Sequence, residues 1–480
     1  MIESTSGYQE RLPARSKAAY ALANGANGLL SGLGLNNLIF FYSEKLNFDT
    51  SLQGIAWLIF IVVNALNDPI LGILEERVNT KIGRRIPILR YGAPLYAVLF
   101  ILMWFPFAPA GNQPLLFVNY LLMLCIFDTV YSMIGLVTYS LPAEMAITAK
   151  ERSSIMVYST LIGFVPTVLG FVLPLALLKK GPGGVLEWQV IMLLIAAIGG
   201  GLLYGSSYFI KENAWARREQ ALGFVASIKE TLKNKQFLVL EVSIFALLIV
   251  STTITTGLLY LFNYVFIKSS SLDYAYFIFP ISALVATIFF FNKFVPRLGV
   301  RKIFIIGSVI GGLGFAMLPL FGRQLSILCI PITFVAVGFA AIIIGQQPLM
   351  SDVIDYDEML TGKRRETTYS GVNALITKAA ISIANWMFLE IIRAYGYNST
   401  CDECTQPDSV ATGVIMAFTI IPVVCVFFAT ISLKYFKLDG PEWLAKKKAL
   451  EQEHQRKEKE YIEFLSRQGK LPGGEATLSM

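Results

Sequence analysis

The sequence predicts an all-α integral membrane protein with twelve transmembrane helices in two six-helix halves. The first observation is composition: of 480 residues, 55% are hydrophobic and 15% are charged, whereas soluble proteins carry about 25% charged residues. The second is that apolar runs of about twenty residues, long enough to cross a bilayer, recur along the chain. The third is that these runs lack the short alternating pattern of membrane β-strands. Helices that satisfy their own backbone hydrogen bonds are therefore expected.

Twelve apolar runs, bounded by charges or by Pro and Gly turns, define the expected helices, with ends good to about four residues. In chain order they are residues 18–43, 52–74, 86–106, 115–139, 153–178, 187–210, 236–266, 272–295, 302–321, 324–348, 370–393 and 410–436. The first run is too long for the apolar region of a cleaved signal peptide, so we expect it to remain as a helix.

Lys and Arg are distributed unequally between the two sets of connections. If both termini are cytoplasmic, that side holds 33 of the 40 Lys and Arg residues, the other side holds 6, and Lys378 lies inside a run. The positive-inside rule therefore predicts cytoplasmic termini, in a multi-pass protein of the cell (plasma) membrane. The net charge of +7 then follows from topology and from attraction to anionic lipid head groups, and it gives no reason to expect nucleic-acid binding.

One long charged connection divides the chain. We expect an N-terminal half at residues 1–210, a cytoplasmic linker at 211–235, a C-terminal half at 236–438 and a charged cytoplasmic tail at 439–480. Residues 81–85 (KIGRR), after the second run, are echoed by 297–302 (RLGVRK), after the eighth. Two related halves with a site at their interface are typical of carriers. We expect the tail to be a solvated or membrane-surface helix with a frayed end and no chemical role.

Cysteine and histidine usage argues against an enzyme. The only histidine, His454, lies in the tail, so no imidazole is available at membrane depth for a nucleophile, a proton relay or a metal site. Cys401 and Cys404 form a CxxC in an outer connection, where a disulfide and two free thiols are both open. Three cysteines inside apolar runs are expected to pack as small apolar residues: Cys125, Cys329 and Cys425. We expect no cofactor, and no metal beyond a transported Na⁺.

Polar side chains recur inside four of the apolar runs, where an ionisable group costs several kcal/mol unless it faces the bundle interior. Spacings of three and four residues place members of each set on one helical face. The sets are Asn64, Asn67 and Asp68 in the second run; Asp128, Tyr131 and Ser132 in the fourth; Asn24 and Asn27 in the first; and Lys378 and Asn385 in the eleventh. Together they predict one wet cavity between the helices.

Oxygen ligands from carboxylate, amide and hydroxyl groups suit a hard cation such as Na⁺. The expected ligands are Asp68, Asn64, Asn67 and Ser132. The alternative is structural: the asparagines bond between helices, and Asp68 or Asp128 forms a buried pair with Lys378. The sequence leaves both interpretations open.

Several segments resemble one known family. Residues 64–72 (NALNDPILG) with 83–87 (GRRIP) resemble the second-helix signature of the glycoside–pentoside–hexuronide:cation symporters, the melibiose-permease-like branch of the major facilitator superfamily. Supporting segments are 128–132 (DTVYS), 141–144 (LPAE) with 151–152 (ER), 351–356 (SDVIDY), and 361–366 (TGKRRE) with Lys378. The resemblance extends from about residue 20 to residue 435.

The resemblance implies a major facilitator fold and a secondary active transporter that moves a cation, Na⁺ or H⁺, together with a small organic solute by alternating access. A sugar or glycoside is the first expectation, and the protein is expected to act as a monomer. Asp68 would be the essential cation carboxylate, with Asn67 and Ser132 as further ligands. Lys378 and Asp128 would link the cation to the substrate. Further substrate contacts are expected from Asn24, Asn27, Tyr131 and Asn385.

The resemblance also implies a cytoplasmic ion-pair network that holds the outward-open state. Its members would be Glu76, Arg84, Arg85, Glu144, Arg152, Asp352, Asp355, Arg364 and Glu366. The alternative is that these are solvated loop charges that only set the topology.

Departures from the family pattern bear on the substrate. Asn64 stands where the family has a second cation carboxylate, Gly28 and Gly135 stand where melibiose-type members have sugar-binding carboxylates, and residues 342–344 (III) replace a tenth-helix aromatic. Each unpaired sugar hydroxyl would cost about 1–3 kcal/mol, which argues against a galactoside. Two alternatives remain: a carrier of lysophospholipid or another amphiphile, and a non-transporting membrane sensor with a carrier fold.

Overall fold

The fold is an all-helical bundle. The computed structural model describes residues 10–78, 80, 82–146, 148–179, 181, 183–212, 229–265, 272–289, 293–321, 325–362, 365–400 and 406–467. The N-terminal half consists of α1 (Ala14–Leu46), α2 (Thr50–Arg77), α3 (Ile86–Trp104), α4 (Gln113–Met145), α5 (Ala149–Leu177) and α6 (Val185–Ser206). The C-terminal half consists of α8 (Lys235–Tyr260), its π-helical end η1 (Leu261–Val265), α9 (Leu272–Phe289), α10 (Val295–Leu298), α11 (Val300–Phe321), α12 (Leu325–Thr361), α13 (Glu366–Ala394) and α14 (Ser409–Lys434).

Each of the twelve predicted runs coincides with one long helix of this bundle. In the described part of the chain, ten helices are long and apolar enough to cross a membrane, and α1 and α9 complete the set of twelve. Several helices extend beyond the predicted ends, because hydropathy marks the hydrocarbon layer and not the end of hydrogen bonding. The largest difference is α12, which continues to Thr361, whereas the apolar run ends at residue 348.

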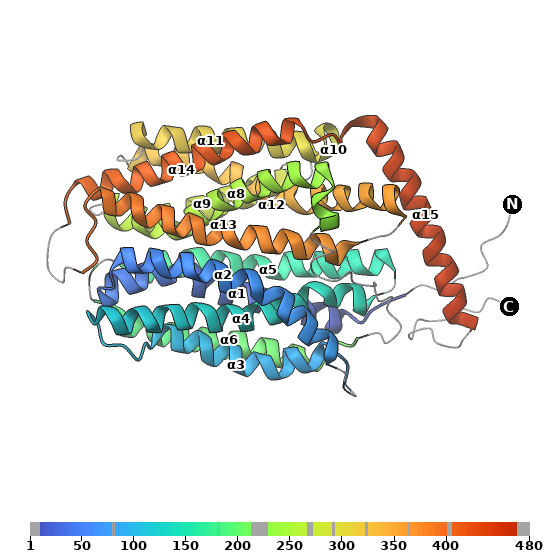
Figure 1. The fold of residues 1–480 in the computed structure, drawn as a ribbon, viewed down its shortest axis with the longest axis horizontal. Coiled ribbons are helices and arrows are strands. Elements are labelled where there is room, and N and C mark those ends of the chain that lie inside the picture. Colours follow the sequence, from blue (N-terminus) through green and yellow to red (C-terminus); the bar gives the residue numbers. More distant parts are fainter. Residues whose placement is uncertain are drawn as a thin grey trace.

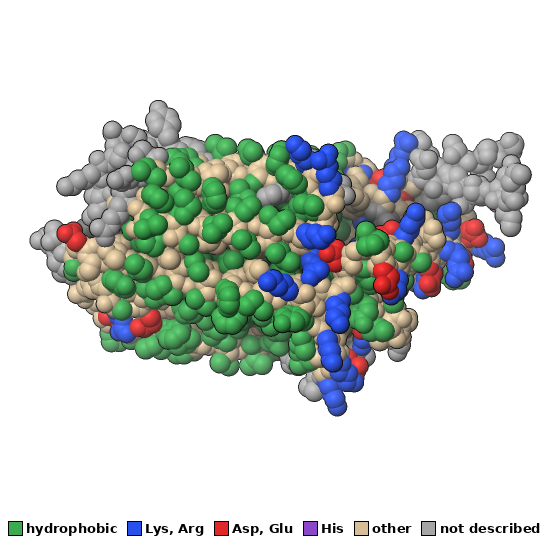
Figure 2. Space-filling view, turned by 90° about the horizontal axis from the view of Figure 1, so that it is seen from above, with side chains coloured by type: hydrophobic (Ala, Val, Ile, Leu, Met, Phe, Trp, Pro, Cys, Tyr) green, Lys and Arg blue, Asp and Glu red, His purple; other side chains and the backbone are tan. Residues whose placement is uncertain are grey.

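The two halves lie side by side with their helices roughly along the long axis, and the start of α1 and the whole of α15 lie at the same end of the bundle (Figure 1). We call this end the termini end and the opposite one the far end. Pairs of helices that join the halves are α2 with α13, α1 with α8, and α5 with α9 and α8. On the face shown in Figure 2, hydrophobic side chains cover the middle of the bundle, while Lys and Arg gather toward the termini end.

Glycines let α11 and α12 approach closely. A Cβ atom on Gly338 would lie 2.6 Å from Cα of Gly311, and one on Gly311 would lie 2.9 Å from Cα of Gly338. Both distances are shorter than van der Waals contact, so only glycine fits at this crossing. The same close approach of small residues is typical of helix pairs in membranes.

The tail forms α15 (Gly440–Arg467), which crosses the termini end of the bundle (Figure 1). Lys447 of this helix pairs with Asp352 of α12 at 2.6 Å. Nε2 of His454 lies 3.0 Å from Oε1 of Glu358, also on α12. The predicted tail helix is therefore present, and these contacts dock α15 on the polar extension of α12.

Candidate functional site

A cluster of four polar side chains joins the halves within the membrane-spanning region. Nζ of Lys378, on α13, lies 2.8 Å from Oγ of Ser132 and 3.7 Å from Oδ2 of Asp128, both on α4. Asn67 of α2 donates from Nδ2 to Oδ2 of Asp128 at 3.2 Å, and Ser132 donates to the same oxygen at 3.5 Å. All four are residues that the sequence analysis named, and the structure brings Lys378 together with Asn67, Asp128 and Ser132.

The cluster contains a compensated buried charge pair. The Lys378 and Asp128 side chains are 15% and 4% exposed, so neither is free in water. Stranding one of two such charges is far more costly than burying the pair together. Asn67 and Ser132 add donors to the Asp128 carboxylate, which lowers the cost of its burial. The structural alternative of an Asp128–Lys378 pair is therefore present in this state of the protein.

The remaining predicted cation ligands lie on α2. Asn64 is 3% exposed, and its Oδ1 is a buried acceptor without a hydrogen-bond donor among the described residues. A buried unpaired carbonyl oxygen is unusual and suits a cation or another donor. Asp68 follows Asn67 in α2, but its side chain lies outside the described residues, so its predicted role stays a prediction.

The predicted polar face of α1 lies against α4 and α5. Asn24 donates to Oγ of Ser159, on α5, at 3.0 Å. Asn27 is 7% exposed, and its Oδ1 has no partner in the described part of the chain. A Cβ atom on Gly135 would lie 4.0 Å from Nδ2 of Asn27, and one on Gly28 would meet nothing within 4 Å. The two glycines therefore leave room beside Asn27 where carboxylates were expected by the family pattern.

Two predicted substrate-binding residues, Asn385 and Tyr131, contact groups outside the Lys378 cluster. Asn385 accepts a hydrogen bond of 2.8 Å from Oγ1 of Thr256, so it joins α13 to α8 within the C-terminal half. Tyr131 is half-buried and packs against the hydrophobic core. The structure does not bring Asn385 to the Lys378 cluster, although both lie on α13.

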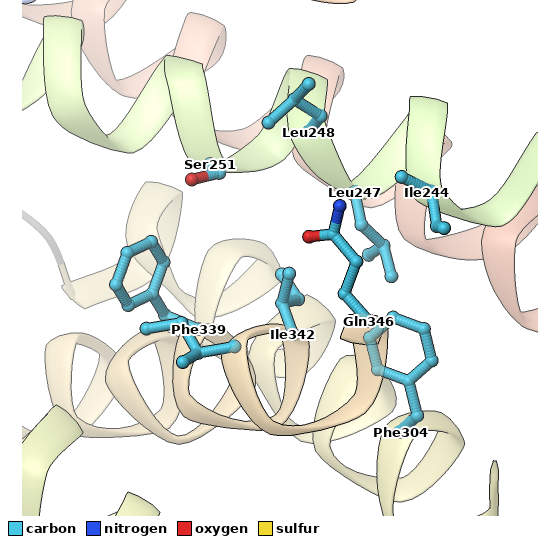
Figure 3. Close-up of a pocket in the computed structure, with 9 residues that line it drawn as sticks. Ile244, Leu247, Leu248, Ser251, Phe304, Phe339, Ile342 and Gln346 are labelled. Atoms are coloured by element: carbon cyan, nitrogen blue, oxygen red, sulfur yellow. The ribbon is translucent and has the colours of Figure 1, made fainter. Parts of the chain in front are cut away.

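An open pocket of about 100 Å³ lies between α8, α11 and α12. Figure 3 shows the Gln346 side chain extending from α12 toward Leu247 and Ser251 of α8. Apart from Ser251 and Gln346 the lining is apolar: Ile244, Leu247, Leu248, Phe304, Phe339, Ile342 and Ile343. Residues 342–344 stand where the family pattern has an aromatic residue, and two of these isoleucines, Ile342 and Ile343, line this pocket.

The predicted network at the termini end forms pairs within each half. Glu144 binds Arg84 at 2.9 Å and Arg85 at 2.7 Å, all in the N-terminal half. Arg152 donates to the carbonyl oxygen of Ala146 at 3.1 Å. Asp352 binds Lys447 of the tail, and Asp355 is buried. Arg364 and the side chains of Glu76 and Glu366 lie outside the described residues.

Two further groups of this network were missed. Arg365 binds Asp357 through two hydrogen bonds of 2.5 and 2.8 Å, and these bonds raise the pKa of the Arg365 guanidinium. Glu212 accepts from the backbone N–H groups of Arg84, Arg85 and Ile86 at 2.7–2.8 Å. A carboxylate at the start of α3 satisfies backbone donors that lack a partner within the helix.

Hydrogen bonds join the halves at the far end. Glu44, at the end of α1, accepts from the hydroxyl groups of Tyr264 and Tyr397 in the C-terminal half. The Tyr260 hydroxyl donates to Oγ of Ser43 at 3.2 Å, and Oγ of Ser399 donates to the carbonyl oxygen of Phe48 at 2.7 Å. The structure therefore shows a state closed at the far end. We call these hydrogen bonds the clasp. It was not predicted, because the predicted first helix ends at residue 43, one residue before Glu44.

Comparisons with known proteins agree with this architecture. Residues 20–440 match the family described as MFS/sugar transport protein. The chain is 23% identical over 462 residues to the uncharacterized symporter YnaJ of Bacillus subtilis, covering 94% of this chain and 96% of that protein. It is 20% identical to the isoprimeverose transporter of Lactiplantibacillus pentosus, covering 93% of both chains, and 21% identical to a glucuronide carrier protein homolog of Escherichia coli, covering 89% and 93%.

Solved structures share the fold. The D-xylose-proton symporter superposes with a TM-score of 0.62 at 15% identity, covering 86% of this chain and 96% of that chain. The nucleoside transporter NupG gives a TM-score of 0.62 at 15% identity, covering 88% and 100%. The matched family spans residues 20–440 and thus most of the chain. The chain therefore belongs to the MFS/sugar transport protein family, in the glycoside–pentoside–hexuronide:cation symporter branch of the major facilitator superfamily, and is a multi-pass membrane transporter.

Proposed function

We propose that this protein carries out cation-coupled symport of a small organic solute, with a sugar or glycoside as the substrate class, by alternating access in the plasma membrane. The observation that carries the proposal is the cluster in which Lys378 of one half binds Asp128 and Ser132 of the other. Family membership and the names of the relatives support the same function. The excess of Lys and Arg at the termini end supports cytoplasmic termini.

Coupling follows from the electrostatic effect of the bound cation on the Asp128–Lys378 pair. A cation bound by Asp68, Asn64 and Asn67 would sit beside Asp128, because Asn67 already contacts that carboxylate. Its positive charge would weaken the attraction between Asp128 and Lys378. The two halves would then separate at this point more easily, and the substrate bound between them could be carried across. The cation is Na⁺ or H⁺, because a single carboxylate on α2 suits either ion.

The substrate proposed here has a polar and an apolar part. Asn24, Asn27 and the space beside Gly28 and Gly135 offer amide groups and room in the N-terminal half. The pocket of the C-terminal half is apolar except for Ser251 and Gln346. A glycoside with an apolar aglycone would satisfy both surfaces. The apolar pocket also supports a second candidate, a lysophospholipid or similar amphiphile.

A thermal-shift screen of the purified protein tests the substrate class. The panel contains isoprimeverose, methyl and phenyl glucuronides, lysophosphatidylcholine and small organic acids, each with and without Na⁺. Binding to the folded state raises the unfolding temperature, so we expect a glycoside with an apolar aglycone to give the largest shift. A sodium-dependent shift would identify Na⁺ as the coupling ion. Stabilisation by lysophosphatidylcholine alone would contradict the glycoside proposal and favour the second candidate.

A further inference from the structure

Glu241 of α8 is a buried carboxylate that the proposed transport site does not use. Glu241 is 3% exposed and lies within the membrane-spanning part of α8. It lies six residues after Lys235, where α8 begins at the termini end, which is about 9 Å along the helix axis. Water at the termini end is therefore nearer to Glu241 than water at the far end.

One amide is the partner of this carboxylate among the described residues. Asn373 of α13 donates from Nδ2 to Oε1 of Glu241 at 2.8 Å and to Oε2 at 3.1 Å, in the amide orientation that satisfies both groups. Glu44, the buried carboxylate at the far end, has more donors: two tyrosine hydroxyls and the backbone N–H of Gly181 at 3.2 Å. The ionised form is thus well solvated by the protein at Glu44 and poorly at Glu241.

Several charged side chains on or beside the helices that pack against α8 are paired with other groups. These helices are α1, α5, α12, α13 and α14. The pairs are Lys378 with Asp128, Lys447 with Asp352, Arg365 with Asp357, His454 with Glu358, Lys17 with Glu151, and Arg393 with Glu390. Lys235 and Lys434 are exposed at helix ends.

An ionised carboxylate in a low-dielectric interior needs a cation or several donors, and one amide does not offset the lost hydration. Protonation removes the charge and leaves a group that one amide can satisfy. We propose that Glu241 is a proton-binding site of the C-terminal half, neutral in this far-end-closed state and able to release its proton to water at the termini end during the transport cycle. On release the O–H bond breaks, the carboxylate keeps the electron pair, and the proton passes to water.

The position of Asn373 connects this site to the transport cluster. Asn373 lies on α13, the helix that also carries Lys378, and the Thr256–Asn385 hydrogen bond is a second polar contact between α8 and α13. A movement of α13 that follows the separation of Lys378 from Asp128 changes the Glu241–Asn373 contact and hence the stability of the protonated form. This link rests on the proposed transport function, whereas the protonation of Glu241 does not.

Infrared spectroscopy of the purified full-length protein tests the protonation itself without any substrate. The spectrum of the wild type should contain a C=O band of a protonated carboxyl group that Glu241→Gln removes. Glu390→Gln, which alters a more exposed carboxylate on α13, should leave the band unchanged. Asn373→Leu removes the one donor to the ionised form, so the band should persist to higher pH. A band that remains in Glu241→Gln, or that responds equally to Glu390→Gln, would overturn the proposal.

A transport assay tests the release step. The substrate is the glycoside that most stabilises the wild type. In proteoliposomes loaded with it, Glu241→Gln should keep substrate exchange. Net uptake driven by a proton gradient should fall by about tenfold or more, because glutamine cannot release a proton. Glu241→Asp, which can titrate, should restore part of the net uptake. Glu390→Gln should match the wild type. Net uptake in Glu241→Gln equal to that of the wild type would overturn the release step, as would a wild type that exchanges substrate but shows no net uptake under a proton gradient. Failure of every variant and the wild type to exchange would instead contradict the transport function.

Discussion

Lys378 is the residue on which the account of coupling depends most, because it contributes the charge that crosses between the halves. Removing its ammonium group leaves the Asp128 carboxylate buried without a cation, at a cost of about 3 kcal/mol. We expect Lys378→Met to lower the unfolding temperature and to abolish coupled uptake. The double variant Lys378→Met with Asp128→Asn should recover most of the stability but none of the coupled uptake.

Thermal unfolding in detergent and uptake in proteoliposomes measure these two effects. Lys434→Met, at an exposed position at the end of α14, is the matched control and should change neither. If the double variant were as unstable as Lys378→Met, the buried pair would not be the reason for the loss.

The site could be predicted from sequence where polar residues repeat at helical spacing. Asn67, Asp128 and Ser132 were found in this way, and the structure brings them together with Lys378. Glu241 was missed because no second polar residue lies one turn away from it to define a polar face. The free-energy cost of a carboxylate at membrane depth was the signal that could have identified Glu241 as a functional residue.

At the scale of elements, the crossing of α11 and α12 depends on glycine. Gly338→Ala would place a Cβ atom 2.6 Å from the backbone of Gly311, so the helices must move apart, at a cost of about 1–3 kcal/mol. We expect a lower unfolding temperature. Gly170→Ala on α5, where a Cβ atom meets nothing within 4 Å, should leave the unfolding temperature unchanged or slightly raised. Equal effects of the two substitutions would contradict close helix contact.

The clasp at the far end joins α1 to η1 and to the segment after α13. A hydrogen bond to a charged group contributes about 1.5–3 kcal/mol, so Tyr397→Phe should shift the equilibrium toward opening of the far end by about tenfold or more. In a protein with Ser43→Cys as the only cysteine, we expect faster labelling by a membrane-impermeant maleimide. Tyr435→Phe, at an exposed tyrosine of the termini end, serves as control. An unchanged labelling rate would mean that Glu44 does not hold the halves together.

The helices themselves were largely predictable, because apolar length sets the span across a bilayer. Their ends were less so. Residues 349–361 of α12 carry Asp352, Asp355 and Glu358, which end the apolar run but leave the hydrogen bonding of the helix intact. The docking of α15 could not be predicted either, because its pairs with α12 join charges about a hundred residues apart.

For the whole molecule, the sequence could indicate two halves and an orientation but not a conformational state. Glu144 with Arg84 and Arg365 with Asp357 pair within their own halves here, while the halves are bonded at the far end. The network expected to hold the outward-open state would require these groups to exchange partners across the halves. States of a carrier differ by a few such contacts, and the same residues serve each state in turn.

The central claim is that a cation gradient drives solute accumulation through Asp68 and the cluster beside it. The direct measurement is uptake of the most stabilising glycoside into proteoliposomes under an imposed Na⁺ gradient at clamped pH, and under an imposed proton gradient. We predict accumulation above the external concentration under at least one gradient, and Asp68→Asn should abolish it while exchange persists. Uptake that stops at equal concentrations under both gradients, or accumulation unchanged in Asp68→Asn, would contradict the account.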